Sequence, residues 1–457
     1  MKIQRLFIAN RAEIALRILA SAELLGIETI LGASDADLDS VPARRTDYCV
    51  RIGPAPAAHS YLDIAAVVGA ARAAAADALH PGYGFLSENP ALARACESAG
   101  LIFVGPSPAT LEAVGDKLAA REHAVAAGVP VVPGAAVASL AECEQFVGAL
   151  GWPILIKAVG GGGGRGLRRV DSPGQLASQL ELASSEANAA FGDPRVYVER
   201  YLPGARHVEV QLLGDATDVV HLGTRDCSVQ RRYQKLIEEG PAPGLTPALA
   251  QRIAGAAVTL GRRLRYRSAG TVEFLVDSAR DEFYFLEMNA RIQVEHPVTE
   301  MISGCDLVAE QLAIAAGSRL RFTQQQLSIR GHALECRINA EDLEQGLRPS
   351  PGRVSRAIFP AGPGIRVDTH IEAGSAVPSF YDSLLAKIIV HAEDRGAAID
   401  RMAAALARCD IGGVAVNTRL HARILADPEY RAGAVDTAYL ERLLAGTDQA
   451  PARAAAG

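Results

Sequence analysis

The sequence lacks the features that define several special classes of protein. No apolar run approaches the roughly 18 residues that a membrane-spanning helix needs, and the net charge of −6 gives no electrostatic basis for binding nucleic acid. The first residues, MKIQRLFIANRAEIALRIL, predict a strand and then a helix, because no small-residue cleavage site of a signal peptide follows a compact apolar core. We therefore expect contact with neither nucleic acid nor membrane.

Cysteine and lysine are both used sparingly. The seven cysteines are scattered and form no Cys-x-x-Cys pair, which is typical of buried thiols in a reducing cytoplasm. Of the 46 basic residues only five are lysines: Lys2, Lys117, Lys157, Lys235 and Lys387. A chain so biased toward arginine has reason to keep lysine only where a compact ammonium group is needed. Compositional drift is the alternative explanation.

At 457 residues the chain is too long for one ordinary core, so we expect about two to four subdomains. Residues 1–113 alternate short strands with helices, beginning with Leu6–Ala9, Glu13–Leu25 and Glu28–Ala33, which predicts a doubly wound parallel sheet. Residues 331–446 contain short strands, turns and the helix Ala397–Ala407, and predict an α+β domain packed on the earlier part. The alanine-rich tail 447–457 is expected to be flexible.

A loop rich in glycine, proline and asparagine, HPGYGFLSEN (His80–Asn89), follows one predicted strand of the first sheet. Ligands of such sheets bind beyond the carboxyl ends of the strands. His80, Tyr83 and Glu88 are therefore candidates for ligand contacts. A purely structural turn explains the same loop equally well.

A run of five glycines lies in GGGGGRG, Gly160–Gly166, between the short strands Pro153–Ala158 and Leu167–Val170. Ordering so many glycines is entropically costly, but their backbone N–H groups can approach phosphate oxygens closely. Because Lys157 precedes the run and an arginine lies within it, the segment predicts a hairpin flap over a polyphosphate and not a linker. It is neither a Walker A loop, since no Gly-Lys-Ser/Thr follows, nor a dinucleotide fingerprint, since it joins strand to strand.

Two later strands predict a metal site. Thr271–Asp277 and Glu282–Asn289 alternate in character, and the turn between them places Glu273 opposite Glu287. Paired carboxylates repel each other unless a cation lies between them. Together with Asn289 they offer oxygen ligands that suit Mg²⁺ or Mn²⁺. A polar cluster follows, consisting of Arg291, Gln293, Glu295 and His296. A surface loop would explain any one of these residues but not the whole cluster.

Three further polar segments are candidates for the same site. The strand Arg195–Arg200 ends in a short loop through Leu202, and its edge offers backbone groups to an adenine. The polar run Arg225–Glu239 follows the predicted strand Val219–Leu222. Gly331–Asp342 begins a strand with Glu335 and Arg337 on one face. The polar run carries Gln230, Tyr233 and Lys235.

In order along the chain, HPGYGFLSEN, GDK, GGGGGRG, RDCSVQRR, EMNARIQVEHPVTE and ECRINAED resemble the motifs of the biotin carboxylases, within the ATP-grasp superfamily. The resemblance runs from Arg5 to about Leu444 and is highly specific as a set, whereas the glycine flap and the metal hairpin alone would indicate only ATP-grasp. It implies a biotin carboxylase N-terminal domain (1–113), an ATP-grasp domain (114–330) with a lid at about 131–203, and a biotin carboxylase C-terminal domain (331–446).

The resemblance also implies a reaction. ATP phosphorylates bicarbonate to carboxyphosphate, which yields the CO₂ that carboxylates biotin on a biotin carboxyl carrier protein. Two divalent ions, Mg²⁺ or Mn²⁺, take part, and members of the family commonly form homodimers. The sequence contains no AMKM-type biotinylation site and no carboxyltransferase segment. We therefore expect a separate carrier and separate carboxyltransferase subunits, as in a multicomponent acyl-CoA carboxylase of fatty acid biosynthesis.

The resemblance gives roles to the matched residues. Glu295 resembles the base that deprotonates bicarbonate, and Arg337 the residue that stabilises the biotin enolate. Lys235, Arg291, Gln293 and the backbone of Val294 resemble the bicarbonate site, and Glu273, Glu287 and Asn289 the metal ligands. The predicted catalytic residues are Lys235, Arg291, Glu295 and Arg337. The residues that resemble ATP contacts are Lys117, Lys157, Gly163, Gly164, Glu199, Arg200, Tyr201, Leu202, His207, Gln230, Tyr233, Glu273 and Glu287.

Three positions depart from the family pattern. Tyr233 stands where bacterial members usually have His, Ala12 where they have Gly, and Thr437-Ala438 where an Ile-His pair lies at the adenine wall. The changes at Tyr233 and at Thr437-Ala438 keep open a catalytically weakened homologue with a structural or regulatory role. Another ATP-grasp ligase, of the carbamoyl-phosphate type or a purine-biosynthetic carboxylating enzyme, is the second alternative, although Arg291, Glu295 and Arg337 in their motifs argue against it.

Overall fold

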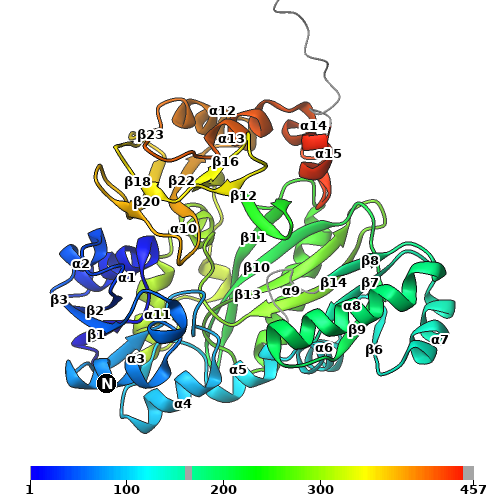
Figure 1. Ribbon diagram of the computed structural model, residues 1–457, viewed down its shortest axis with the longest axis horizontal. Helices are drawn as coiled ribbons and strands as arrows, with labels where there is room; N and C mark the ends of the chain where they lie inside the picture. Colours follow the sequence, from blue (N-terminus) through cyan, green and yellow to red (C-terminus); the bar gives the residue numbers. More distant parts are fainter. Residues whose placement is uncertain (1, 160–166, 446–457) are drawn as a thin grey trace, which may run out of the picture.

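The computed structural model describes residues 2–159 and 167–445, in which an N-terminal α/β part, a central body and a C-terminal layer of helices are arranged around one large sheet (Figure 1). The predicted glycine flap Gly160–Gly166, which includes Gly163 and Gly164, and the tail 447–457 lie outside the described residues. The predicted mixed α/β class is confirmed.

The N-terminal sheet is parallel and has the strand order β3-β2-β1-β4-β5. Successive strands are added first on one side of β1 and then on the other, so the predicted doubly wound topology is confirmed. Its strands are β1 (Arg5–Ile8), β2 (Glu28–Ser34), β3 (Tyr48–Gly53), β4 (Ala78–His80) and β5 (Ile102–Phe103). The edge strand β3 was not predicted, because several of its side chains are exposed and its apolar pattern is weak.

Five helices surround this sheet: α1 (Ala12–Leu24), α2 (Val41–Arg45), α3 (Ile64–Ala73), α4 (Pro90–Ser98) and α5 (Pro108–Gly115). Capping side chains set where they begin. Asp63, Asn89 and Ser107 each accept backbone N–H groups in the first turn of α3, α4 and α5. Asp116 does the same for α6 (Lys117–Ala126), which therefore begins at Lys117.

An eight-stranded antiparallel sheet organises the rest of the protein, in the order β14-β13-β10-β11-β12-β15-β22-β20. Its strands are β10 (Arg206–Asp215), β11 (Val219–Arg231), β12 (Gln234–Gly240), β13 (Arg267–Asp277), β14 (Glu282–Asn289), β15 (His332–Asn339), β20 (Ile365–Thr369) and β22 (Leu384–Ala392). Because β12 pairs with β15, the sheet continues past residue 330. The C-terminal part therefore extends the central sheet and does not merely pack on it.

Strand β11 is longer than the predicted strand Val219–Leu222 and continues through the polar run to Arg231. The polar side chains do not interrupt it because they are paired inside the protein. Arg225, for example, is fully buried and donates to Glu209 at 2.5 Å.

A separate four-stranded sheet, β6-β9-β7-β8, stands beside the large sheet (Figure 1). Its strands are β6 (Gly134–Val137), β7 (Ile154–Ala158), β8 (Arg168–Val170) and β9 (Val196–Arg200), and its helices are α7 (Leu140–Leu150) and α8 (Pro173–Phe191). It has a small core of its own that includes Val147, Ile156 and Val198. This unit coincides with the predicted lid, but the lid role and the domain boundaries stay predictions.

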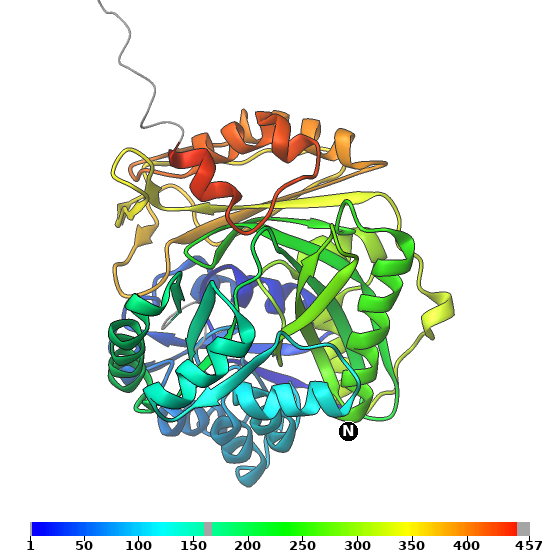
Figure 2. The same cartoon turned by 90° about the vertical axis from the view of Figure 1, so that its right-hand side faces the viewer.

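The remaining helices cover the large sheet. The helix α9 (Pro247–Arg263) is capped by Thr246 with Pro247 at its first position, and packs on β10 and β11. The helix α10 (His296–Ser303) packs on β11, β12, β15 and β22, and α11 (Leu307–Ala315) packs on β13. The helices α12 (Arg395–Leu406), α13 (Thr418–Ala426), α14 (Pro428–Arg431) and α15 (Tyr439–Ala445) form the C-terminal layer (Figure 2). Short strand pairs complete this part: β16 (Glu341–Asp342) with β17 (Arg348–Pro349), β18 (Gly352–Arg353) with β21 (Ala376–Val377), and β19 (Arg356–Ile358) with β23 (Asp410–Gly412).

The burial of the cysteines differs from the prediction at two positions. Five of the seven cysteines are buried, but Cys49 is exposed and Cys409 is only partly buried, so the prediction of buried thiols is wrong for these two. Cys49 is exposed because it lies on the edge strand β3. No helix within the described ranges has the length and apolar character needed to cross a bilayer.

Candidate active site

The predicted pairing of two carboxylates on the central hairpin is confirmed. In the antiparallel pair β13 and β14, Glu273 lies opposite Glu287, and Thr271 lies opposite Asn289. Glu273 is buried and Glu287 is partly buried. Burial, and then the neighbouring Glu273 carboxylate, raise the pKa of Glu287, as expected for like charges that share a site.

Lys235 on β12 binds three carboxylates. Its ammonium group donates to Glu209 Oε2 at 2.6 Å, to Glu273 Oε1 at 2.8 Å and to Glu295 Oε1 at 2.7 Å. Burial disfavours a charged lysine, yet Cys227 and these carboxylates raise the pKa of Lys235 well above its ordinary value. Lys235 therefore stays charged and joins β10, β13 and the loop that ends at Glu295.

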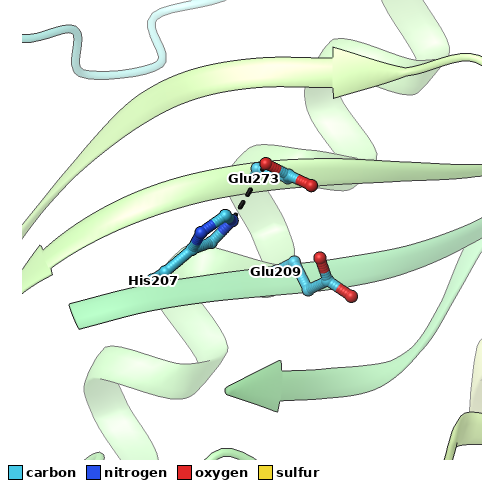
Figure 3. A group of neighbouring side chains, drawn as sticks. All are labelled: His207, Glu209 and Glu273. Atoms are coloured by element: carbon cyan, nitrogen blue, oxygen red, sulfur yellow. Dashed lines mark ion pairs between the residues drawn. The ribbon is translucent and has the colours of Figure 1, made fainter. Parts of the chain in front are cut away.

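Figure 3 shows His207 and Glu209 on β10 beside Glu273 of the neighbouring strand β13. His207 Nε2 lies 2.9 Å from Glu273 Oε2. Burial lowers the pKa of His207, but the Glu273 carboxylate outweighs this effect and the pKa is raised. The possible ligand atoms of these three residues lie close enough together to hold one metal ion. Glu209, Cys227 and Glu295 form a second such group.

The three predicted metal ligands, Glu273, Glu287 and Asn289, do not form one compact group of ligand atoms in the described part of the structure. Glu287 belongs to neither of the two groups found among the described residues. Asn289 donates to Glu273 Oε1 at 3.0 Å and accepts from Arg291 at 2.9 Å. Two carboxylates and an amide oxygen are nevertheless hard donors, and the raised pKa of Glu287 means that a nearby cation would stabilise its charge. The donor set fits a hard divalent cation.

Glu295 lies between two cations. It directly precedes α10 and is fully buried, with Lys235 at Oε1 and Arg337 of β15 at 2.8 Å from Oε2. Burial alone would raise the pKa of Glu295, but Lys235 and Arg337 hold it well below its ordinary value. Glu295 is therefore ionised at neutral pH. Arg337 also donates to Glu238 of β12 at 2.6 Å, and burial raises the pKa of Glu238 to about 7.

The loop after β14 brings Arg291 and Gln293 to the same cluster. Gln293 donates to Glu273 Oε1 at 3.0 Å, and Arg291 Nε donates to Glu88 Oε2 at 2.8 Å. Glu88 also accepts the backbone N–H of Ala290 at 2.9 Å. The segment His80–Asn89 therefore contacts the predicted site through Glu88.

His80 in the same segment has a structural role instead. It is fully buried, and its Nδ1 accepts the backbone N–H of Gly82 at 3.0 Å. Burial lowers the pKa of His80 to about 3, so the ring is neutral. For this residue the interpretation as a structural turn is correct.

Four predicted nucleotide residues from different elements line one small cavity of about 50 Å³: Lys117, Lys157, Glu199 and Glu287. Lys157 forms an ion pair with Glu199. Burial lowers the pKa of Lys117. Two ammonium groups beside the carboxylate hairpin form an arrangement that suits phosphate oxygens together with a cation.

The other predicted nucleotide residues are more dispersed. Gln230 lies 3.4 Å from His207 Nδ1, while Tyr233 is half-exposed at a φ of 65° in the turn between β11 and β12. Thr437 donates its backbone N–H to the carbonyl of Ala205 at 3.0 Å, next to the start of β10. Within the described part of the chain, the cavity lining does not include Arg200, Tyr201 or Leu202.

Sequence reasoning missed three buried charges: Glu209, Arg225 and Glu238. Polar residues alternate along β10 at His207, Glu209 and Gln211, and this pattern is a signal that would have found Glu209. Arg225 donates to Gln211 at 2.8 Å as well as to Glu209. Glu238 carried no comparable signal, because its partner Arg337 lies far along the chain.

Comparison with known families covers nearly the whole chain in three consecutive matches. The biotin carboxylase N-terminal domain matches residues 2–111, and the biotin carboxylase C-terminal domain matches residues 335–442. Between them, residues 116–323 match the ATP binding domain of the carbamoyl-phosphate synthase L chain.

Individual relatives match over almost their full lengths. A biotin carboxylase from Nostoc sp. is 47% identical over 448 residues, which cover 97% of this chain and 100% of that protein. A pyruvate carboxylase component from Methanothermobacter thermautotrophicus is 44% identical over 447 residues, with 97% and 91% covered. The solved biotin carboxylase domain dimer of Hydrogenobacter thermophilus 2-oxoglutarate carboxylase, in complex with MgADP, ADP and bicarbonate, is 41% identical with a TM-score of 0.94, and 97% of this chain and 98% of that chain are covered.

Proposed function

Because the chain belongs to the biotin carboxylase family and is a ligase with an ATP-grasp domain, we propose that it uses ATP and bicarbonate to carboxylate biotin on a carrier protein. The proposed intermediate is carboxyphosphate. One observation carries the proposal: the buried carboxylate of Glu295 lies between Lys235 and Arg337, beside the hairpin that pairs Glu273 with Glu287.

The phosphates of ATP are proposed to bind at Lys117 and Lys157, whose compact charges line the cavity beside the hairpin. Glu273, Glu287 and Asn289 would hold Mg²⁺ or Mn²⁺, and we propose two ions. A bound metal ion supplies neutralisation of the charge that develops on the phosphates during transfer. The further proposed ATP contacts are Gly163, Gly164, Glu199, Arg200, Tyr201, Leu202, His207, Gln230 and Tyr233.

The proposed bicarbonate residues are Lys235, Arg291, Gln293, Val294 and Glu295. An anion bound here competes with Glu295 for the donors of Lys235 and Arg337. As those donors turn to the anion, Glu295 loses the contacts that hold its pKa low and becomes a stronger base. Glu295 then takes the proton of bicarbonate, and the resulting oxyanion attacks the γ-phosphorus of ATP, so that ADP leaves and carboxyphosphate forms.

Arg337 is proposed to act in the second half of the reaction. Carboxyphosphate breaks down to CO₂ and phosphate, and the phosphate takes the N1′ proton of biotin. N1′ then attacks the carbon of CO₂, while the guanidinium group stabilises the enolate-like oxygen of biotin. Glu238 binds Arg337 independently of Glu295. It would therefore keep the guanidinium in place when Glu295 changes its contacts.

We propose that the partners are a separate biotin carboxyl carrier protein and carboxyltransferase subunits of a multicomponent acyl-CoA carboxylase, and that the chain forms a homodimer. The similarity to a domain dimer supports the second point. The free thiols of all seven cysteines support action in a reducing cytoplasm. Sedimentation of the purified protein checks the dimer, which a purely monomeric species would contradict.

A second candidate function differs from the first in the molecule that finally receives the carboxyl group. Relatives named as parts of pyruvate and 2-oxoglutarate carboxylases are nearly as similar as the biotin carboxylase of Nostoc sp., which favours a 2-oxo acid as the alternative to an acyl-CoA. The complex isolated from the source organism, supplied with labelled bicarbonate, distinguishes the two. Label in malonyl-CoA, the product of carboxylating acetyl-CoA, would support the first candidate, and label in the carboxylated product of pyruvate or of 2-oxoglutarate would support the second.

Phosphate release from ATP with Mg²⁺ and bicarbonate, with and without free biotin, tests the function itself. We expect a biotin-dependent rate that falls about 100- to 10,000-fold in Glu295→Gln, with ATP binding retained. Glu282→Gln, at the exposed start of β14, is the control and should leave the rate unchanged. A rate indifferent to biotin would favour another ATP-grasp ligase, and tight ATP binding without turnover would favour a non-catalytic subunit.

A further inference from the structure

Two carbonyls of the loop that ends at Glu295 are bound by buried side chains that the proposed mechanism does not use. Lys387 Nζ donates to the carbonyl of Val294 at 2.8 Å. His296 Nδ1 lies 2.7 Å from the carbonyl of Gln293. Lys387 and His296 are both 0% exposed. The backbone orientation of this loop is therefore set by groups to which no role in the reaction has been assigned.

The register of the large sheet places Lys387 for this contact. On β22, Lys387 lies opposite Arg337 of β15 on one side and opposite Asp368 of β20 on the other. Residues opposite each other in antiparallel strands have side chains on the same face, so Lys387 lies on the face that carries Arg337. Its ammonium group is 3.1 Å from Glu13 Oε2 and 3.7 Å from Asp368 Oδ2. Burial disfavours its charge, but Glu13, Glu335 and Asp368 raise the pKa of Lys387.

These contacts join distant parts of the chain to the loop. Glu13 lies on α1 and also accepts a hydrogen bond from the Tyr83 hydroxyl, which belongs to the segment His80–Asn89. At the other end of α10, Glu300 accepts from Arg17 of α1 and from Arg366 of β20, both at 2.7 Å. The helix that begins after Glu295 is thus tied at both ends to the N-terminal and C-terminal parts of the protein.

We propose that Lys387 is a positioning residue for the carboxylation reaction. It fixes the peptide between Val294 and Glu295, while His296 holds the preceding peptide, which carries the Val294 N–H. The Val294 N–H and the Glu295 carboxylate are thereby set for bicarbonate. This inference rests on the proposed function of that loop. A compact ammonium directs separate donors at a carbonyl and at carboxylates, which the planar fork of arginine does not do in the same space. The role also accounts for Lys387, one of the five lysines, which lies in none of the sequence motifs.

Lys387→Met tests the proposal, because methionine has a similar length but neither donors nor charge. We expect kcat/KM for bicarbonate to fall about 10- to 100-fold, the range for loss of a charged hydrogen bond, while the Kd for ATP changes less than about 3-fold. Arg395→Met is the matched control, since it breaks the ion pair with Glu239 at 2.6 Å, away from the loop. It should lower the melting temperature without lowering kcat/KM for bicarbonate.

The double variant Lys387→Met with Glu13→Gln separates positioning from charge neutralisation. If Lys387 acted only as the partner of Glu13, removing both charges would restore bicarbonate kinetics, and that result would overturn the proposal. We expect the double variant to stay impaired. The double variant leaves no unpaired Glu13 carboxylate. If Lys387→Met alone fails to fold, the bicarbonate kinetics of the double variant are therefore compared with those of the wild type.

Assays of the wild-type protein show whether a negative result refutes the positioning role of Lys387 or the proposed function itself. Absence of biotin- and bicarbonate-dependent phosphate release in the wild type would refute the proposed function. An active wild type together with an unchanged kcat/KM for bicarbonate in Lys387→Met would overturn the positioning role alone.

Discussion

Replacing Arg337 with methionine removes the cation that two buried carboxylates share. Arg337 donates to Glu238 Oε1 at 2.6 Å and to Glu295 Oε2 at 2.8 Å, and both carboxylates are 0% exposed. Breaking a buried ion pair by removing one partner costs about 3–5 kcal/mol. We therefore expect Arg337→Met to lower the free energy of unfolding by about that amount near pH 8 and to lose biotin-dependent turnover.

The pH dependence of this loss has a definite sign. Burial raises the pKa of Glu238 from 4.5 to about 7, so its ionisation in the folded state costs about 3 kcal/mol above pH 7, at about 1.4 kcal/mol per pH unit. Because the folded pKa is above the unfolded one, this cost disappears as the pH falls through about 7 toward 4.5. Arg337 lowers the pKa of Glu238, so its removal makes Glu238 take up its proton at a higher pH. The stability gap between variant and wild type should therefore narrow by about 1 kcal/mol between about pH 8 and about pH 6.

Urea unfolding followed by circular dichroism at about pH 8, 7 and 6 measures this gap. In a Glu238→Gln background the same Arg337→Met change should cost less, and its cost should vary less with pH in this range, because Glu238 no longer titrates and Glu295 keeps its contact with Lys235. The exposed pair of Arg356 and Asp410 supplies a control, and Arg356→Met should leave the unfolding midpoint unchanged. A gap that is equal at every pH would refute the view that Arg337 compensates a buried, ionised Glu238.

Two further substitutions test the nucleotide side of the site. Glu287→Gln should raise the Mg²⁺ concentration for half-maximal turnover by at least about 10-fold, because it removes one of the paired hairpin carboxylates; an Mg²⁺ titration of phosphate release checks this, and a curve that matches wild type would remove Glu287 from the metal site. Tyr233→His restores the residue usual in the family and should change the KM for ATP less than about 3-fold, because Tyr233 is half-exposed in a turn; a larger change in ATP kinetics would show that this side chain contacts the nucleotide.

Local pattern was sufficient wherever partners lie close together in the chain. Alternation along two neighbouring strands placed Glu273 opposite Glu287, and the structure has that register. Alternating strands and helices in residues 1–113 predicted the parallel N-terminal sheet. The polar run from Arg225 onward was not predicted as a strand. Charged side chains fit a buried strand only when other buried groups pair with them, and the sequence does not show those partners.

What only the tertiary structure decided is which distant charges meet. Lys235 reaches Glu209 and Glu273 because β12, β11, β10 and β13 are consecutive neighbours in one sheet. Glu238 meets Arg337 because β12 pairs with β15, across the boundary predicted at residue 330. The period of a strand shows which face a side chain occupies but not which strand lies beside it. The packing of the whole sheet decides which strands are neighbours. Because an unpaired charge in the core costs several kcal/mol, the buried charged residues of this protein depend most on that order of strands.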